Sequence, residues 1–386
     1  MQNSGVARGR RGRYGAEVRG RIGGVVLVGL GLGCGGAGTG ASAGEASTGG
    51  ASAVGASTSG DGANTGPVSG TGGAAPTSGE GESDGTTTEA ATTEAATSTS
   101  ATSTGEAEST GAADCPARAQ LGVWVWQPSQ VTEPSQAAAL LAFAAAQGVT
   151  HVYVESELLL AQEPERLAMF VEEADAMCVA VELLFGAAEW ALAENHAVPL
   201  ALVEDALDFV DRLAGARPVG LHFDVEPHGL ADWDTNQATY AGEYLDLLEQ
   251  MATNLQGSEL ALTVDVAFWY DGVLIERDGE QRPLSELVQD RVDRIVVMDY
   301  RDHAEPPDGI LDNAAAEVAY AGTVGGRVRV AVESTCGLVP EKVTFCEEGA
   351  IAMSLALELT KMSYAGSPGW DGVAVHDFAA WSVLMD

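Results

Sequence analysis

The stretch Gly220-Leu-His-Phe-Asp-Val-Glu-Pro227 alternates polar and apolar residues in the way of a β-strand. Because successive side chains of a strand point to opposite faces, His222, Asp224 and Glu226 share one face. The apolar residues between them face the other way, where a packing helix would cover them. Three ionisable groups on one buried face are costly unless they are paired or used. We therefore predict a strand over 220–225 that carries chemically active side chains at its carboxyl end.

Seven further runs of the same kind surround this strand in the sequence, separated by longer Ala/Leu/Glu-rich stretches with helical spacing. With 220–225, the predicted strands are Gly122–Trp126, His151–Glu155, Ala180–Phe185, Ala261–Ala267, Arg294–Asp299, Arg327–Val332 and Gly372–His376. Strand and helix in alternation imply a parallel sheet, and eight strands in this length favour closure into a (β/α)₈ barrel. An open doubly wound sheet is the alternative, although no glycine-rich phosphate fingerprint follows the first strand.

Composition divides the 386 residues into three parts. Residues 1–34 combine several arginines with the apolar run from Ile22 to Gly33, which predicts an export signal and is too short to span a membrane. Residues 35–113 are Gly, Ser, Thr, Ala and Glu with almost no large apolar side chain, so we expect a disordered tether. Residues 114–386 have the length of one (β/α)₈ barrel.

Cys34 closes the apolar run and is preceded by a glycine. This context resembles the lipobox of bacterial lipoproteins, in which the cysteine after the cleavage site becomes lipidated. It departs from that pattern at Gly31, where the lipobox has leucine. We expect an exported protein, anchored by lipid on Cys34 at the outer membrane or cell surface, with a freely secreted form as the alternative.

Four cysteines remain besides Cys34, and an even number in an exported chain permits disulfides. Cys336 and Cys346 flank one predicted loop and are the favoured pair. No Cys-x-x-Cys motif or histidine cluster accompanies them, so we expect no metal, and nothing implies an organic cofactor.

The formal net charge of −37 would repel phosphate backbones and argues against nucleic acid as a partner. We expect a monomer whose partner is a carbohydrate substrate and whose only membrane contact is the lipid anchor.

Active sites of parallel barrels lie at the carboxyl ends of the strands. There, a carboxylate at Asp224 would raise the pKa of Glu226 and help it to keep the proton that a glycosidase gives to a leaving oxygen. Aromatic rings near strand ends suit the C–H faces of sugars. The candidates for substrate contact are Trp124, Trp126, Glu157, His222, Asp265, Trp269 and Trp381.

Three short motifs resemble the family 18 glycoside hydrolases, the chitinase-like barrels. Asp224-x-Glu226 is similar to the end of their D-x-x-D-x-D-x-E signature, which also lies on the fourth strand. Met298-Asp-Tyr300 resembles their M-x-Y element, and the segment from Gly372 to Trp381 resembles the one whose tryptophan floors the sugar site. The resemblance implies that Glu226 is the general acid, that Tyr300 contacts the sugar, and that the substrate's acetamido group, positioned by Asp224, is the nucleophile.

The sequence departs from that signature at its two other aspartates, where it has Val219 and His222. Arg301 also follows Tyr300 at a position where the family has Asp or Asn. Because of these departures, a barrel that binds carbohydrate without turnover is the alternative interpretation.

A second resemblance is to the large clan of retaining β-glycosidases, whose acid/base Glu ends strand four and whose nucleophilic Glu ends strand seven. Glu226 and Glu333 occupy these places. A retaining pair lies about 5–5.5 Å apart and an inverting pair about 6.5–9.5 Å. Glu226 is the acid in both interpretations, and only the nucleophile differs.

The sequence thus predicts a surface-anchored glycoside hydrolase acting on a poly- or oligosaccharide, with retention of configuration. The alternative is a non-catalytic, lectin-like barrel. Hydrolysis of an amide or ester is a third possibility, but no Gly-x-Ser-x-Gly elbow supports it.

Overall fold

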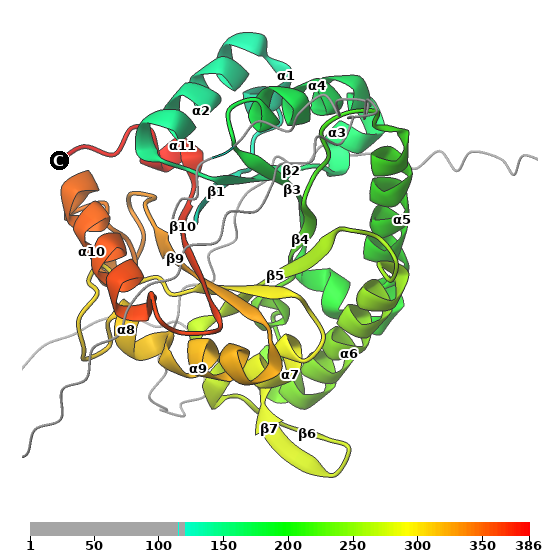
Figure 1. The fold of residues 1–386 in the computed structure, drawn as a ribbon. Coiled ribbons are helices and arrows are strands. Elements are labelled where there is room, and N and C mark those ends of the chain that lie inside the picture. The colour runs from blue at the N-terminus through cyan, green and yellow to red at the C-terminus, as the bar shows by residue number, and fades with distance from the viewer. Residues whose placement is uncertain (1–114, 116–119) are drawn as a thin grey trace, which may run out of the picture. The chain divides into compact units, whose positions relative to one another are not determined.

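The computed structural model describes Cys115 and residues 120–386, shown in colour in Figure 1. The predicted signal segment, the tether and Cys34 lie outside the described residues, and so does the lipidation predicted for that cysteine.

Eight parallel strands close into a barrel in the order β1-β10-β9-β8-β5-β4-β3-β2. They are β1 (Leu121–Val125), β2 (His151–Glu155), β3 (Ala180–Gly186), β4 (Gly220–Asp224), β5 (Ala261–Ala267), β8 (Arg294–Met298), β9 (Arg327–Glu333) and β10 (Trp370–His376). Because β1 pairs in parallel with both β2 and β10, the sheet has no free edge. The predicted (β/α)₈ barrel is confirmed, and the open sheet is excluded.

The strand boundaries agree with the predicted ones to within two residues. A hairpin of β6 (Leu274–Arg277) and β7 (Glu280–Pro283), not predicted from the sequence, projects beyond the helices in Figure 1. Its turn is Asp278-Gly279, with φ angles of 55° and 83°. An Asp-Gly pair with positive φ is the preferred two-residue hairpin turn, so the signal was present in the sequence.

Helices surround the barrel on its outside (Figure 1). They are α1 (Ser129–Thr132), α2 (Pro134–Gln147), α3 (Glu157–Gln162), α4 (Pro164–Asp175), α5 (Ala197–Arg212), α6 (Trp233–Asn254), α7 (Leu284–Gln289), α8 (Ile310–Asn313), α9 (Ala315–Val324), α10 (Gly349–Tyr364) and α11 (Phe378–Trp381). Proline at the first position of α2 and α4 presets the helical φ. Within residues 120–386, none of these helices has both the length and the apolar character needed to cross a membrane.

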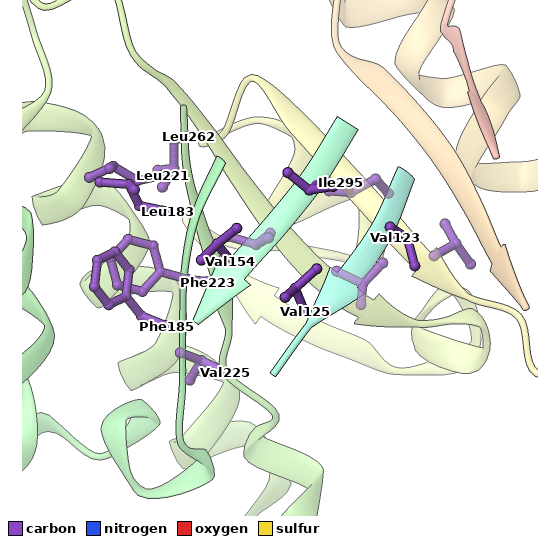
Figure 2. Close-up of a cluster of buried hydrophobic side chains, with 14 of the residues drawn as sticks. Val123, Val125, Val154, Leu183, Phe185, Leu221, Phe223, Val225, Leu262 and Ile295 are labelled. Atoms are coloured by element: carbon purple, nitrogen blue, oxygen red, sulfur yellow. The ribbon is translucent and has the colours of Figure 1, made fainter. Parts of the chain in front are cut away.

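Apolar side chains form two separate layers, as the alternation predicts. The outward-facing ones, such as Leu221, Phe223 and Val225, are almost completely buried in one large cluster (Figure 2). Burial of each such side chain contributes about 1.5–3 kcal/mol. A second cluster, formed by Trp124, Tyr153, Leu184, Val296, Ala331 and Ala374, occupies the barrel interior. The polar residues of β4 therefore share the interior with this second layer.

Two disulfides join the four cysteines of the described residues. One links Cys336 to Cys346, the pair favoured by the sequence, within the segment that follows β9. The other links Cys115 to Cys178, 63 residues apart, and ties the segment before β1 to the turn between α4 and β3.

Candidate active site

Asp224 ends β4, and Glu226 follows it by two residues at the carboxyl end of the barrel. The Oδ1 atom of Asp224 is buried and has no hydrogen-bond partner. Burial, reinforced by the charges of Glu226 and Asp265, raises the pKa of Asp224 well above its usual range. Asp224 therefore retains its proton at pH values where an isolated aspartate has lost it.

Glu226 is held by His228, which was not among the predicted site residues. The side chain of Glu226 is 36% exposed, and its Oε2 lies 3.1 Å from Nε2 of His228. The other ring nitrogen, Nδ1, lies 2.8 Å from the hydroxyl of Tyr270. If the Tyr270 hydroxyl donates to Nδ1, the proton of His228 is on Nε2 and points at Glu226. A histidine two residues after a candidate acid, with proline between them, was the available signal.

His222 lies beneath the acid pair and is completely buried. Its Nε2 is 2.8 Å from Oδ1 of Asp265, and its Nδ1 is 3.5 Å from Oε2 of Glu182. Burial alone would lower the pKa of His222, but the two carboxylates outweigh it and raise the pKa to about 9. Where the family 18 signature has an aspartate, this chain thus holds a cation. Asp265 also accepts a hydrogen bond of 3.3 Å from the indole of Trp124.

Deeper in the barrel, Glu182 joins His222 to a second layer of charges. Arg294 and Arg329 lie 3.0 and 3.5 Å from its carboxylate, and both also bind Asp371, at 2.6 and 2.9 Å. Burial opposes ionisation of Glu182, but His222, at 3.5 Å, and the two arginines outweigh burial and lower its pKa.

Two arginines near the barrel interior that could neutralise the acid pair are engaged elsewhere. Arg329 binds Glu182 and Asp371, and Arg301 binds Asp308 at 2.8 Å. Within residues 120–386, no arginine or lysine forms an ion pair with Asp224 or Glu226. A purely structural ion pair does not account for these two carboxyl groups.

Glu333 ends β9 and is almost fully enclosed, with 1% of its surface exposed. Its Oε1 accepts hydrogen bonds of 2.7 Å from the backbone N–H groups of Ser334 and Thr335. Its Oε2 lies 2.8 Å from Nδ1 of His376. Burial raises the pKa of Glu333, but His376 and the Thr335 amide outweigh it, and the net shift is downward. Glu333 is an ionised carboxylate whose two oxygens are already occupied.

The predicted aromatic and rim residues differ in their access to solvent. Trp126, Trp269 and Tyr300 are partly exposed near the strand ends, whereas Trp124 is 1% exposed inside the barrel. Carboxylates surround Tyr300, and burial together with Glu333, Asp265, Asp224 and Glu226 raises its pKa well above the usual range.

Two of the predicted substrate-contacting residues, Trp381 and Glu157, lie away from the residues described above. Trp381 is 8% exposed, and its ring packs edge-on against Phe143 of α2 with 5.0 Å between the ring centroids. The helix α11 begins directly after β10 and carries Trp381 into the helix layer, so the sequence interpretation of this residue as a sugar platform does not match its environment. Glu157 is exposed at the first turn of α3, outside the barrel interior.

No family model and no curated protein matches this sequence. Solved structures with a similar fold include a GH39 enzyme from Xanthomonas axonopodis pv. citri, with 15% identity, coverage of 67% of this chain and 58% of that chain, and a TM-score of 0.47. Dispersin B has 10% identity, coverage of 69% and 94%, and a TM-score of 0.44. A chitinase from Chromobacterium violaceum has 12% identity, coverage of 69% and 97%, and a TM-score of 0.40.

The arrangement can transfer a proton. A partly exposed carboxyl, Glu226, is oriented by His228 and paired with a buried carboxyl, Asp224, that resists ionisation. General acid–base catalysis requires such a group within reach of a substrate atom, and partly exposed aromatic rings lie at the same end of the barrel.

Proposed function

We propose that this chain is a glycoside hydrolase acting on a poly- or oligosaccharide, with Glu226 as general acid/base. The observation that carries the proposal is the Asp224–Glu226 pair at the carboxyl end of β4, which has no arginine or lysine partner among residues 120–386 and in which burial raises the pKa of Asp224 well above its usual range. Cleavage of a glycosidic bond needs a carboxyl that gives a proton to the leaving oxygen, and Glu226 is the partly exposed member of the pair. Tyr300 and Trp269 would contact the sugar from neighbouring strand ends.

The environment of Glu333 favours the substrate-assisted mechanism over the two-carboxylate one. A nucleophilic carboxylate needs an oxygen free to reach the anomeric carbon, and both oxygens of Glu333 are engaged in a site that is 1% exposed. The nucleophile would then be the acetamido group of an N-acetylated sugar, with Asp224 beside it. Both mechanisms retain the anomeric configuration.

A paired substrate panel tests this proposal. We expect the full chain to release sugar from N-acetylated chitin oligosaccharides and not from their de-acetylated counterparts, because only the former supply their own nucleophile. New reducing ends would be measured for the acetylated oligosaccharides, for the de-acetylated ones and for β-glucans. Release of sugar from β-glucan would instead support Glu333 as the nucleophile.

A carbohydrate-binding barrel without turnover is the second candidate. The observation favouring it is His222, a buried cation at a position where the family 18 signature has an acid. Retained binding to one saccharide, with no release from any, would establish this second function in place of the first.

We further propose that the barrel is exported and anchored through lipid on Cys34. The other four of the five cysteines are joined in two disulfides, which suits an oxidising compartment and leaves Cys34 outside both pairs. We expect a full chain expressed in a bacterium with a lipoprotein pathway to sediment with membranes, and its Cys34→Ser variant to be recovered in the soluble fraction. Equal sedimentation of the two forms would contradict the anchor.

A further inference from the structure

A continuous chain of hydrogen bonds links Glu333 to Trp126 across three neighbouring strands. His376, the last residue of β10, binds Oε2 of Glu333 through Nδ1 at 2.8 Å. Its Nε2 lies 2.9 Å from Nε1 of Trp126, which follows β1. An indole N–H can only donate, so Nε2 of His376 must be the acceptor. The ring proton is therefore on Nδ1 and is donated to Glu333.

The Trp126 end of this hydrogen-bond chain lies beside the proposed acid pair, Asp224 and Glu226. Gly186, at the end of β3, has no side chain, and a Cβ added there would be 3.5 Å from Cη2 of Trp126 and 3.1 Å from Cβ of Asp224. The six-membered ring of Trp126 and the side chain of Asp224 thus border the same bare glycine. Trp124, two residues earlier on the same side of β1, is 1% exposed and cannot present a face to a ligand.

We propose that Trp126 is the aromatic platform on which a pyranose ring lies next to Asp224 and Glu226, and that His376 and Glu333 are positioning residues that fix its plane. The inference rests on the proposed function and extends it, because it gives the strand-end carboxylate of β9 a role other than nucleophile. An indole held through its N–H loses little freedom when a sugar packs on its face, and ordering a side chain in advance lowers the cost of binding.

The hydrogen bonds from Glu333 through His376 to Trp126 also make the position of the Trp126 ring sensitive to pH. Besides Trp126, the groups that face His376 are Glu333 on β9, Asp265 on β5, Asp377 directly after its own strand, and the rings of Trp124 on β1 and Tyr300 after β8. Burial lowers the pKa of His376, but Glu333 outweighs burial and raises it. A protonated His376 cannot accept from Trp126. The hydrogen bond that fixes the Trp126 ring is therefore present when the pH is above the pKa of His376, and it is lost as the pH falls through that pKa.

Two variants of the full chain separate these contributions. Trp126→Phe keeps an aromatic plane and removes the N–H, whereas His376→Gln removes the titration. Protonated imidazole quenches a neighbouring indole, so we expect the tryptophan fluorescence of the wild type to drop as pH is lowered. The drop should be smaller in both variants and keep its wild-type size in His303→Gln, which removes an exposed histidine on the loop after β8. Part of it should remain, because the ring of Trp124 also lies 5.6 Å from His376 and that of Trp269 lies 5.0 Å from His228.

The second measurement is the affinity for an N-acetylated chitin tetrasaccharide, obtained by titrating the sugar into each protein at pH 8. Loss of one hydrogen bond predicts about five- to ten-fold weaker binding by His376→Gln, measured at a temperature at which the variant is folded. Wild-type affinity in both variants, or a fluorescence drop of wild-type size in both, would overturn the inference and leave the proposed function standing. A wild type that neither binds nor cleaves any saccharide would overturn the proposed function and the platform with it.

Discussion

Replacing Glu226 with glutamine is expected to lower sugar release by the full chain about 10²- to 10⁴-fold, the range that general acid–base groups contribute. Glutamine keeps the size of the side chain and can still bind His228, which lies 3.1 Å from the carboxylate. It cannot give a proton to a leaving oxygen. Because Glu226 is 36% exposed, we expect the variant to fold as the wild type does.

The measurement is the initial rate of reducing-end release on whichever saccharide the wild type cleaves. Glu276→Gln is the matched control, since Glu276 is exposed on the β6–β7 hairpin and has the same chemical change. The control should retain the wild-type rate. A Glu226→Gln variant with near wild-type activity would remove Glu226 from the mechanism. Saccharide binding should survive in the variant, since the aromatic contacts are unchanged.

The alternation within residues 220–227 was enough to predict which side chains of β4 enter the barrel. Strand geometry fixes the direction of neighbouring side chains with a period of two, and Leu221 and Phe223 are buried in the outer layer as expected. The closed barrel was predictable for a similar reason, because eight short strands with helices between them have few other ways to bury both faces.

The partners of each side chain were much harder to predict. His228 reaches Glu226 because Pro227 begins a short 3₁₀ turn, a local geometry that strand periodicity does not describe. Trp381 was placed at the sugar site by motif resemblance, but the short helix α11 carries its ring into the helix layer. The position of Glu333 at a strand end did not reveal that His376 and two backbone amides occupy its oxygens.

The charged interior of the barrel was also outside the reach of sequence reasoning. Glu182, Arg294, Arg329 and Asp371 come from four strands and meet only because the barrel closes. Each of these residues alone is an ordinary charged residue in a strand pattern, and nothing in the linear sequence pairs them. Long-range pairing of this kind depends on strand register.

Replacing Glu182 with glutamine is expected to lower the free energy of unfolding by about 3–5 kcal/mol, the usual cost of removing one partner from a buried ion pair. Glu182 is completely buried and contacts Arg294, Arg329 and His222. In the variant, Asp371 alone would neutralise the two arginines, and His222 would keep only Asp265. Urea unfolding with the disulfides intact would measure the change. Glu173→Gln is the control, because its ion pair with Arg166 is at the surface and should be worth at most about 1 kcal/mol.

The dependence of this effect on pH separates an electrostatic cause from a packing defect. The pKa of His222 is raised to about 9 in the folded protein, above the value of about 6.5 expected in the unfolded chain. Its charge therefore stabilises the wild type fully below pH 6.5, and that stabilisation is lost as pH rises through 9. Without Glu182 the pKa of His222 falls, so less stabilisation is available to lose. The difference between wild type and Glu182→Gln should accordingly be largest near pH 6 and shrink toward pH 9, whereas a cavity or a steric defect would cost the same at both values.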